Sequence, residues 1–158
     1  MQVLRHTGGQ SLAEFALIAP LLVLVLFGIV ELGILLNVYI GLTNSAREAA
    51  RAGAIFQYTG TAPLSGDTAA VGTIDTARRA SIDAVIAETL NPVVDPATIQ
   101  VTTNYTPTTA LESNPYRAGD ALVVEIDHDH QLFFGILGSQ QITIKATSTM
   151  RIEPGGTP

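Results

Sequence analysis

The first 55 residues carry the longest apolar run of the chain. No charged side chain lies within residues 15–30, and the apolar character extends over residues 12–39 with only Glu14, Glu31 and Asn37 interrupting it. A helix rises about 1.5 Å per residue, so about 20 apolar residues cross a hydrocarbon core of about 30 Å. The run is long enough to span a membrane. It is also longer than the roughly 7–15-residue apolar region of a cleaved signal peptide.

A single long helix is therefore predicted over residues 10–55, as a transmembrane and assembly segment. Pro20 lies inside it, which a membrane helix tolerates, with or without a kink. The outer part is rich in alanine and places Arg47 and Arg51 one turn apart on one face. Its alanine surface has two interpretations: it packs on the chain's own domain, or it packs closely against copies of itself. Glu31 is interpreted as an interfacial side chain, with pairing to a neighbour's cation as the alternative.

A second, amphipathic helix is predicted over residues 73–90. Its apolar side chains recur at helical spacing, and the charged ones, Arg78 among them, lie largely elsewhere. Thr73 or Asp75 is expected to cap its start, and an Asn-Pro pair ends it. The preceding residues 57–72 are rich in Gly, Thr, Ser, Pro and Ala, which predicts a surface loop.

Three stretches that alternate apolar and polar residues predict an antiparallel sheet of about three strands. They lie within residues 99–105, 122–127 and 142–152. A sheet with one apolar face needs a cover, which we expect from the second helix and the outer half of the first. The predicted fold class is α+β, with a small domain over residues 56–153. The tail, residues 154–158, is expected to be disordered.

Composition narrows the function classes. The chain has 158 residues and a net charge of −6, without a basic stripe, which argues against a nucleic-acid partner. It has no cysteine, which excludes disulfides, Cys-based zinc sites and thiol catalysis. No nucleophile motif, phosphate loop or HExxH is present. We therefore expect a protein that is not an enzyme and carries no cofactor.

The main candidate for chemistry is the run Asp127-His128-Asp129-His130. On a strand, the two histidines face one side and the two aspartates the other. Two imidazoles would bind zinc or copper only with a third ligand. The aspartates, with Glu125, offer oxygen ligands for calcium. We interpret the run as a solvated strand end, and keep a metal site at His128 and His130, with an enzyme built on it, as an alternative.

Residues 132–137, Leu-Phe-Phe-Gly-Ile-Leu, form an unusually apolar connection before the last strand. We interpret this connection as tucked under the sheet. The alternative is a docking patch for a neighbouring subunit or for the membrane surface.

Charge sets the expected topology. The leader, residues 1–9, holds the N-terminal amine and Arg5, whereas Arg47 and Arg51 lie well past the apolar run. Positively charged flanks stay in the cytoplasm. We therefore expect a single-pass protein of the inner, or cytoplasmic, membrane, with its N-terminus inside and its C-terminal domain outside.

The entrance of the apolar run carries a processing pattern. Gly9 precedes Glu14 by five residues, and a long apolar run follows. Prepilin peptidases read this pattern, so the leader resembles a class III signal with cleavage between Gly9 and Gln10. The new amine at Gln10 and the Glu14 carboxylate would then lie one helical turn apart, or meet between neighbouring subunits. Their pairing removes the penalty of burying either charge alone.

Together these features resemble the TadE-like family, the pseudopilins of the tight-adherence (Flp-type) branch of type IV pili. The resemblance covers about the first 55 residues closely. It rests on the processed leader, Glu14-Phe15, Pro20 before the apolar run, Gly28-Ile-Val-Glu-Leu-Gly33 and Ala46-Arg-Glu-Ala-Ala-Arg-Ala-Gly53.

This resemblance implies a pilin-like structural subunit, cut by a prepilin peptidase and assembled through its apolar helix. The implied assembly residues are Glu14, Phe15, Arg47 and Arg51. Implied partners are copies of itself or other pilin-like subunits, the prepilin peptidase, and the pilus assembly ATPase and platform proteins. A cell-surface pilus is an implied location. The alternative is a permanently membrane-anchored extracytoplasmic domain that binds a ligand or organises an envelope complex.

Overall fold

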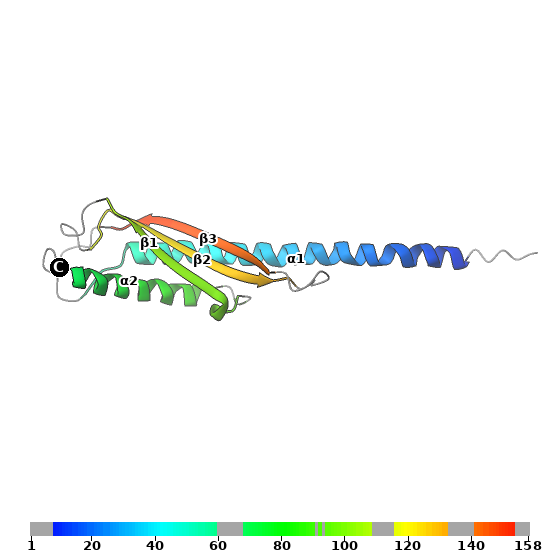
Figure 1. The fold of residues 1–158 in the computed structure, drawn as a ribbon, viewed down its shortest axis with the longest axis horizontal. Helices are drawn as coiled ribbons and strands as arrows, with labels where there is room; N and C mark the ends of the chain where they lie inside the picture. The colour runs from blue at the N-terminus through cyan, green and yellow to red at the C-terminus, as the bar shows by residue number, and fades with distance from the viewer. Residues whose placement is uncertain are drawn as a thin grey trace, which may run out of the picture.

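The computed structural model describes residues 8–59, 68–90, 92, 94–108, 116–132 and 141–153. Its elements follow in the order α1 (Gly8–Ala54), α2 (Thr68–Thr89), a short 3-10 turn (Pro96–Thr98), β1 (Ile99–Thr106), β2 (Ala121–Gln131) and β3 (Gln141–Arg151). Figure 1 shows α1 as a long rod whose N-terminal part projects away from the other elements. The predicted α+β class, with one long helix, a second helix and a three-stranded antiparallel sheet, is confirmed.

Helix α1 has 47 residues and is therefore about 70 Å long. It passes through Pro20 as one α-helix, so the proline does not divide it. The helix begins at Gly8 and ends at Ala54, close to the predicted bounds of 10 and 55.

Helix α2 begins earlier than predicted. It starts at Thr68, so the part of the expected loop from residue 68 to residue 72 is helical, and neither Thr73 nor Asp75 is a cap. Val71 is buried and extends the apolar stripe by one turn. The glycine at position 72 suggested a loop, but a helix tolerates a single glycine at a cost of about 1 kcal/mol relative to alanine.

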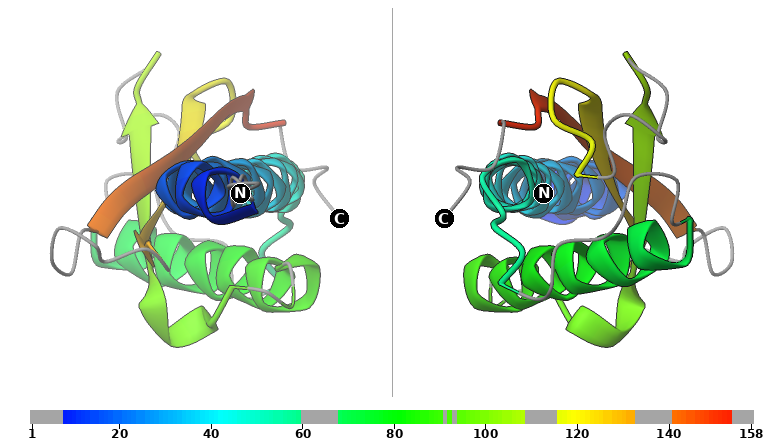
Figure 2. Two further views of the ribbon diagram at one scale, coloured as in Figure 1. Left: turned by 90° about the vertical axis from the view of Figure 1, so that its right-hand side faces the viewer. Right: turned by 90° about the vertical axis from the view of Figure 1, so that its left-hand side faces the viewer.

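The sheet has the order β1-β2-β3, and both pairings are antiparallel. Ile126, in the central strand, pairs with Val101 on one side and Ala146 on the other. Viewed end-on, α1 and α2 lie next to each other, and the strands pass along one side of the two helices (Figure 2). The edge strand β1 is tied to α2, because Arg79 Nη1 donates a hydrogen bond of 3.1 Å to Thr103 Oγ1.

The core is built on the C-terminal half of α1, which we call the packed half, residues 38–54. Gly53 marks the closest approach: a Cβ placed there would lie 2.6 Å from Leu122 Cδ2 and 2.7 Å from Ile82 Cδ1. Of the two interpretations of the alanine surface, the structure supports packing on the chain's own domain. The fully buried side chains of this half are Val38, Leu42, Ala46, Ala49 and Ala50.

Arg78 corrects a second expectation about α2. It was placed off the apolar face, but it is only 1% exposed. Its Nη1 donates to Asp75 Oδ1 at 3.0 Å and its Nη2 donates to the Tyr116 carbonyl at 2.9 Å. An arginine can occupy an apolar stripe when its long stem packs and its guanidinium finds such partners.

Arg117 completes this network from the segment before β2. It has a φ of 59°, which is unusual for a residue other than glycine. Its Nη2 donates to Asp75 Oδ2 at 2.8 Å, and its guanidinium lies 4.1 Å from the centre of the Tyr105 ring. The carboxylate of Asp75 thus binds two arginines and fixes the start of β2 against α2.

Candidate assembly interface

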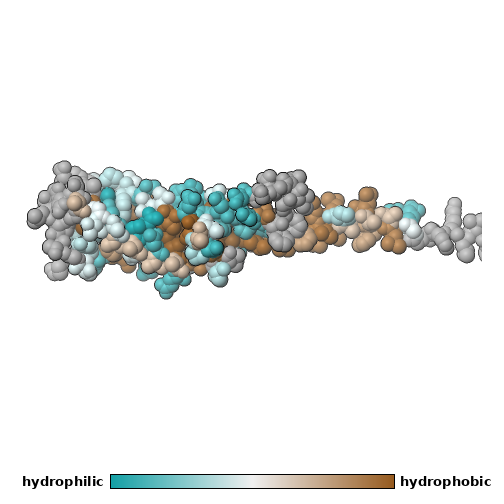
Figure 3. Space-filling model, turned by 60° about the horizontal axis from the view of Figure 1, so that its bottom comes forward, coloured by the Kyte–Doolittle hydropathy of each residue, from teal (hydrophilic) through white to brown (hydrophobic). Residues whose placement is uncertain are grey.

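The N-terminal half of α1, residues 9–30, is apolar and uncovered. We call it the exposed half. Every large apolar side chain from Leu12 to Val30 is at least 40% exposed. Figure 3 shows this hydrophobic segment extending beyond the mixed surface of the rest of the molecule. Only 6% of the most apolar window of α1 is buried, so this part of α1 is not the core helix of a soluble protein.

The length of the exposed half suits a membrane. About 22 residues at 1.5 Å each give roughly 33 Å, close to the hydrocarbon thickness of about 30 Å. Within the part of the chain that the structure describes, α1 is the one helix long and apolar enough to cross a bilayer. The exposed half is therefore a candidate membrane anchor and, equally, a surface that other apolar helices can cover.

The predicted processing residues lie at the free end of this half. The Gln10 side-chain amide donates a hydrogen bond of 3.1 Å to Glu14 Oε1, one turn along the helix. A Cβ at Gly9 would meet nothing within 4 Å, so packing does not explain a glycine at this position. Phe15 is exposed beside Glu14. The structure thus places Gly9, Gln10, Glu14 and Phe15 within two turns on an open surface.

Glu31 closes the other end of the exposed half, where the sequence suggested an interfacial side chain or one paired with a neighbour's cation. Glu31 is 8% exposed within the chain. Its partner comes from the same chain and not from a neighbour, since His130 Nε2 lies 3.3 Å from Glu31 Oε1. This contact joins the end of β2 to α1 at the point where the exposed half ends.

His128 lies two residues before His130 in β2, on the same face of the strand. It is also buried, at 7% exposure. Thr98 gives its hydroxyl proton to the Asp95 carbonyl and accepts at 3.0 Å from His128 Nδ1, so the hydrogen is on Nδ1. Burial, and then the neighbouring His130, lower the pKa of His128 from its ordinary value of 6.5. The interpretation of this run as a solvated strand end was wrong for His128, because this face of the central strand is covered, but it holds for Asp129, which is exposed.

The histidine pair does not have the ligand set of a metal site. The ring centres of His128 and His130 are 6.0 Å apart. Among the described residues, no group of three His, Cys, Asp or Glu side chains is placed to hold a metal ion. On the opposite face, Lys145 Nζ contacts Glu125 and lies 3.4 Å from Asp127 Oδ2, so a cation already sits against these carboxylates.

The two arginines proposed for assembly lie on the solvent side of the packed half. Arg47 and Arg51 are both exposed. Arg51 pairs with Glu48 at 3.6 Å, an exposed pair of the kind that contributes little to stability. Both guanidinium groups can reach another molecule, and their role in assembly stays a prediction.

Two glycines of α1 leave open positions on its surface. A Cβ at Gly28 or at Gly33 would meet nothing within 4 Å. Small residues of this kind let a second helix approach closely.

Comparison with known proteins found one family match, over α1. Residues 9–51 match the family model described as TadE-like protein. Helix α1 is a TadE-like segment. The match starts at the predicted cleavage glycine and runs through both halves of the helix, which confirms the resemblance expected from the sequence. Searches of the curated proteins and of the solved structures found no match.

The TadE-like match suggests a pilus-related protein, and the matched helix is also the candidate membrane span. The family is a structural one and is not known for catalysis. Several predictions fall outside the described residues: most of the leader (residues 1–7), the apolar connection from Phe133 to Leu137, and the tail, residues 154–158.

Proposed function

We propose that this protein is a pilin-like, or pseudopilin, structural subunit of a tight-adherence pilus system. A prepilin peptidase cuts it between Gly9 and Gln10, and it assembles through the exposed half of α1. The observation that carries the proposal is the division of one continuous helix: one half is packed into the domain, and the other is apolar, uncovered and led by Gly9 and Glu14.

The division of α1 suggests how the subunit passes from the membrane into an assembly of subunits. In the membrane, lipid tails cover the exposed half, with the N-terminus inside and the domain outside. Extraction into water would expose 13 large apolar side chains, each worth about 1.5–3 kcal/mol when fully buried. Extraction is therefore favourable only when other apolar helices replace the lipid. The expected partners are copies of this chain or other pilin-like subunits, handled by the assembly ATPase and platform proteins that the family resemblance implies.

Glu14 has a defined place in this cycle. Before cleavage its carboxylate accepts the hydrogen bond from the Gln10 side chain. After cleavage the amine of Gln10 becomes a cation within the same turn, or within reach of a neighbour's Glu14. An ion pair in an apolar surrounding lowers the cost of burying either charge and sets the register between helices.

The mass of the intact protein tests the proposal. The chain is expressed with its own secretion machinery, extracted from the membrane and weighed; we expect a mature chain that starts at Gln10. The variant Gly9→Leu should stay uncut, and Gly28→Leu, at another glycine with open space, should be cut like the wild type. A wild-type chain that keeps its leader would contradict the proposal and favour the permanently anchored domain.

A further inference from the structure

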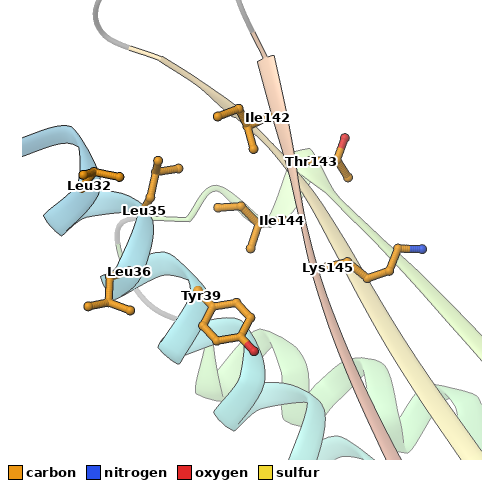
Figure 4. Close-up of a pocket in the computed structure, with 8 residues that line it drawn as sticks. All are labelled: Leu32, Leu35, Leu36, Tyr39, Ile142, Thr143, Ile144 and Lys145. Carbon is orange, nitrogen blue, oxygen red and sulfur yellow. The ribbon is translucent and has the colours of Figure 1, made fainter. Parts of the chain in front are cut away.

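A shallow apolar groove runs along the junction between the exposed and packed halves of α1. We call it the α1–β3 groove. Leu32, Leu36 and Tyr39 form its α1 wall, and Ile142 and Ile144 form its β3 wall. Figure 4 shows α1 and β3 side by side, with these side chains lining the space between them. Four of these five side chains are between 42% and 66% exposed, and Ile144 is buried.

Polar residues beside the groove indicate where the hydrocarbon must end. The contact between buried Glu31 and partly buried His130 lies at the end of β2 that is nearest the exposed half. The next residue, Gln131, pairs with Gln141 in β3, and both are exposed. The exposed side-chain amides of these two glutamines would be unfavourable within the hydrocarbon region. The bilayer core should therefore reach no further than about residue 30, which leaves the groove outside it.

The exposed apolar surface is longer than a membrane can cover. Exposed large apolar side chains continue from Leu12 to Ile40, which is roughly 43 Å of helix. A straight passage through the bilayer covers about 30 Å, and covering the remainder by tilting would need about 45°, beyond the usual range of 0–40°. Lipid tails thus cover the exposed half and leave the α1–β3 groove to another occupant.

We propose that the α1–β3 groove receives the exposed half of α1 from a second copy of this chain, displaced outward along the helix axis. This inference rests on the proposed function. The α1 wall of the groove continues the surface of the exposed half, so one helix can contact both without a break. The groove runs along α1, as a parallel neighbouring helix requires (Figure 4). The second copy supplies an apolar helix in that same orientation.

The displacement follows from the positions of the two surfaces. When two copies stand at the same height in a membrane, the exposed half of each lies below the groove of the other. Bringing Val23 of one copy beside Leu36 of the other takes a shift of 13 residues, or about 20 Å. The groove would then be covered when a subunit leaves the bilayer, so its apolar surface favours the extracted state.

Cross-linking between introduced cysteines tests this placement. The chain has no cysteine of its own, so two tagged copies, Leu36→Cys and Val23→Cys, can be expressed together with the secretion machinery and treated with a short bis-maleimide. We expect a covalent dimer that carries both tags. The matched control is Ile34→Cys, an exposed apolar position of α1 that does not line the groove. It should give at least a several-fold weaker dimer with Val23→Cys.

Each outcome decides a different question. A dimer through Ile34→Cys and not through Leu36→Cys overturns the groove but leaves assembly through α1 standing. A dimer only between two Leu36→Cys copies indicates neighbours at equal height and overturns the displacement. A chain cut at Gly9 that forms no dimer at any of these positions overturns the groove proposal, and lipid then becomes its occupant. An uncut chain refutes the proposed function before the groove is tested.

Discussion

The two halves of α1 have nearly opposite relations to the molecule. In the packed half, Leu42 is completely buried and Gly53 has no room for a methyl group. In the exposed half, Leu24 is about half exposed and Gly28 borders open space. Stability of the isolated subunit is therefore determined by the packed half. The exposed half contributes to interactions with lipid or other subunits.

The junction between the halves is what holds this division in place. Glu31 is the first buried side chain of α1, and it is held by His130 from a strand 99 residues away in the sequence. The contact between Glu31 and His130 holds the end of β2 next to the point where the exposed half ends. The comparison predicts that substitutions on the two sides of Glu31 affect different measurements.

In the exposed half, the expected effect of a substitution is on assembly and not on folding. Glu14→Ala should insert and be cut at Gly9 like the wild type, but its assembly into intermolecular cross-linked products should fall by at least about tenfold, a coupling of about 1.4 kcal/mol. Its melting temperature in detergent should not change, since the contact of Glu14 with Gln10 is exposed and lies within α1. Normal assembly of the variant would remove the role given to this carboxylate.

In the packed half, the same kind of truncation should act on stability instead. Leu42→Ala leaves a cavity among fully buried neighbours and should lower the free energy of unfolding by about 3 kcal/mol. Leu24→Ala, in the exposed half, should change it by less than about 0.5 kcal/mol. Urea unfolding of the full chain in detergent compares the two. Equal losses would mean that the exposed half also packs against the domain.

The predictability of the fold follows the range of the interactions. Helix α1 and the three strands were predictable because 3.6-residue and two-residue periods are local properties. The start of α2 was not, because Val71 gains its burial only through tertiary contacts and Gly72 suggested a loop. The burial of Arg78 depends on Tyr116, 38 residues away, which no periodicity shows.

The candidate site divides in the same way. Gly9, Gln10 and Glu14 form a local pattern, so the processing region was visible in the sequence alone. The partner of Glu31 was not, although a carboxylate in an apolar run and a histidine at a strand end were each conspicuous. Recognising the α1–β3 groove required knowing that Leu36 and Ile142 lie side by side, which only the fold determines.

Gly53 and Gly28 give a sharper comparison of the two halves than the leucines do, because the same side chain is added at both positions. Gly53→Val forces Leu122 and Ile82 to move in a close-packed core and should destabilise the protein by about 2 kcal/mol. Gly28→Val should be nearly neutral in detergent. Thermal unfolding of both full-length variants measures the difference, and a stable Gly53→Val protein would contradict the packing described for α1.

The junction itself can be broken by a double-mutant cycle. Glu31→Gln and His130→Gln each remove one partner of the contact, and we expect a coupling of about 1–2 kcal/mol between them at pH 7. The measurement is urea unfolding of the two single variants and the double variant. Additive losses would show that Glu31 and His130 are neighbours without a stabilising interaction.

The smallest expected effect is the pH dependence contributed by His128. Its pKa is lowered in the folded protein, so the unfolded chain binds the proton more readily. The stability contributed by neutral His128 is therefore complete above pH 6.5 and declines as the pH falls below that value. His128→Asn keeps an N–H donor for Thr98 but does not titrate, and it should flatten the loss of stability between about pH 6.5 and pH 5 by less than about 1 kcal/mol. His130→Gln keeps His128 but removes a neighbour that lowers its pKa, so it should reduce the slope less than His128→Asn does. If the slope is unchanged in His128→Asn, another group causes the acid sensitivity and His128 is not held in its neutral form by the cover of α1.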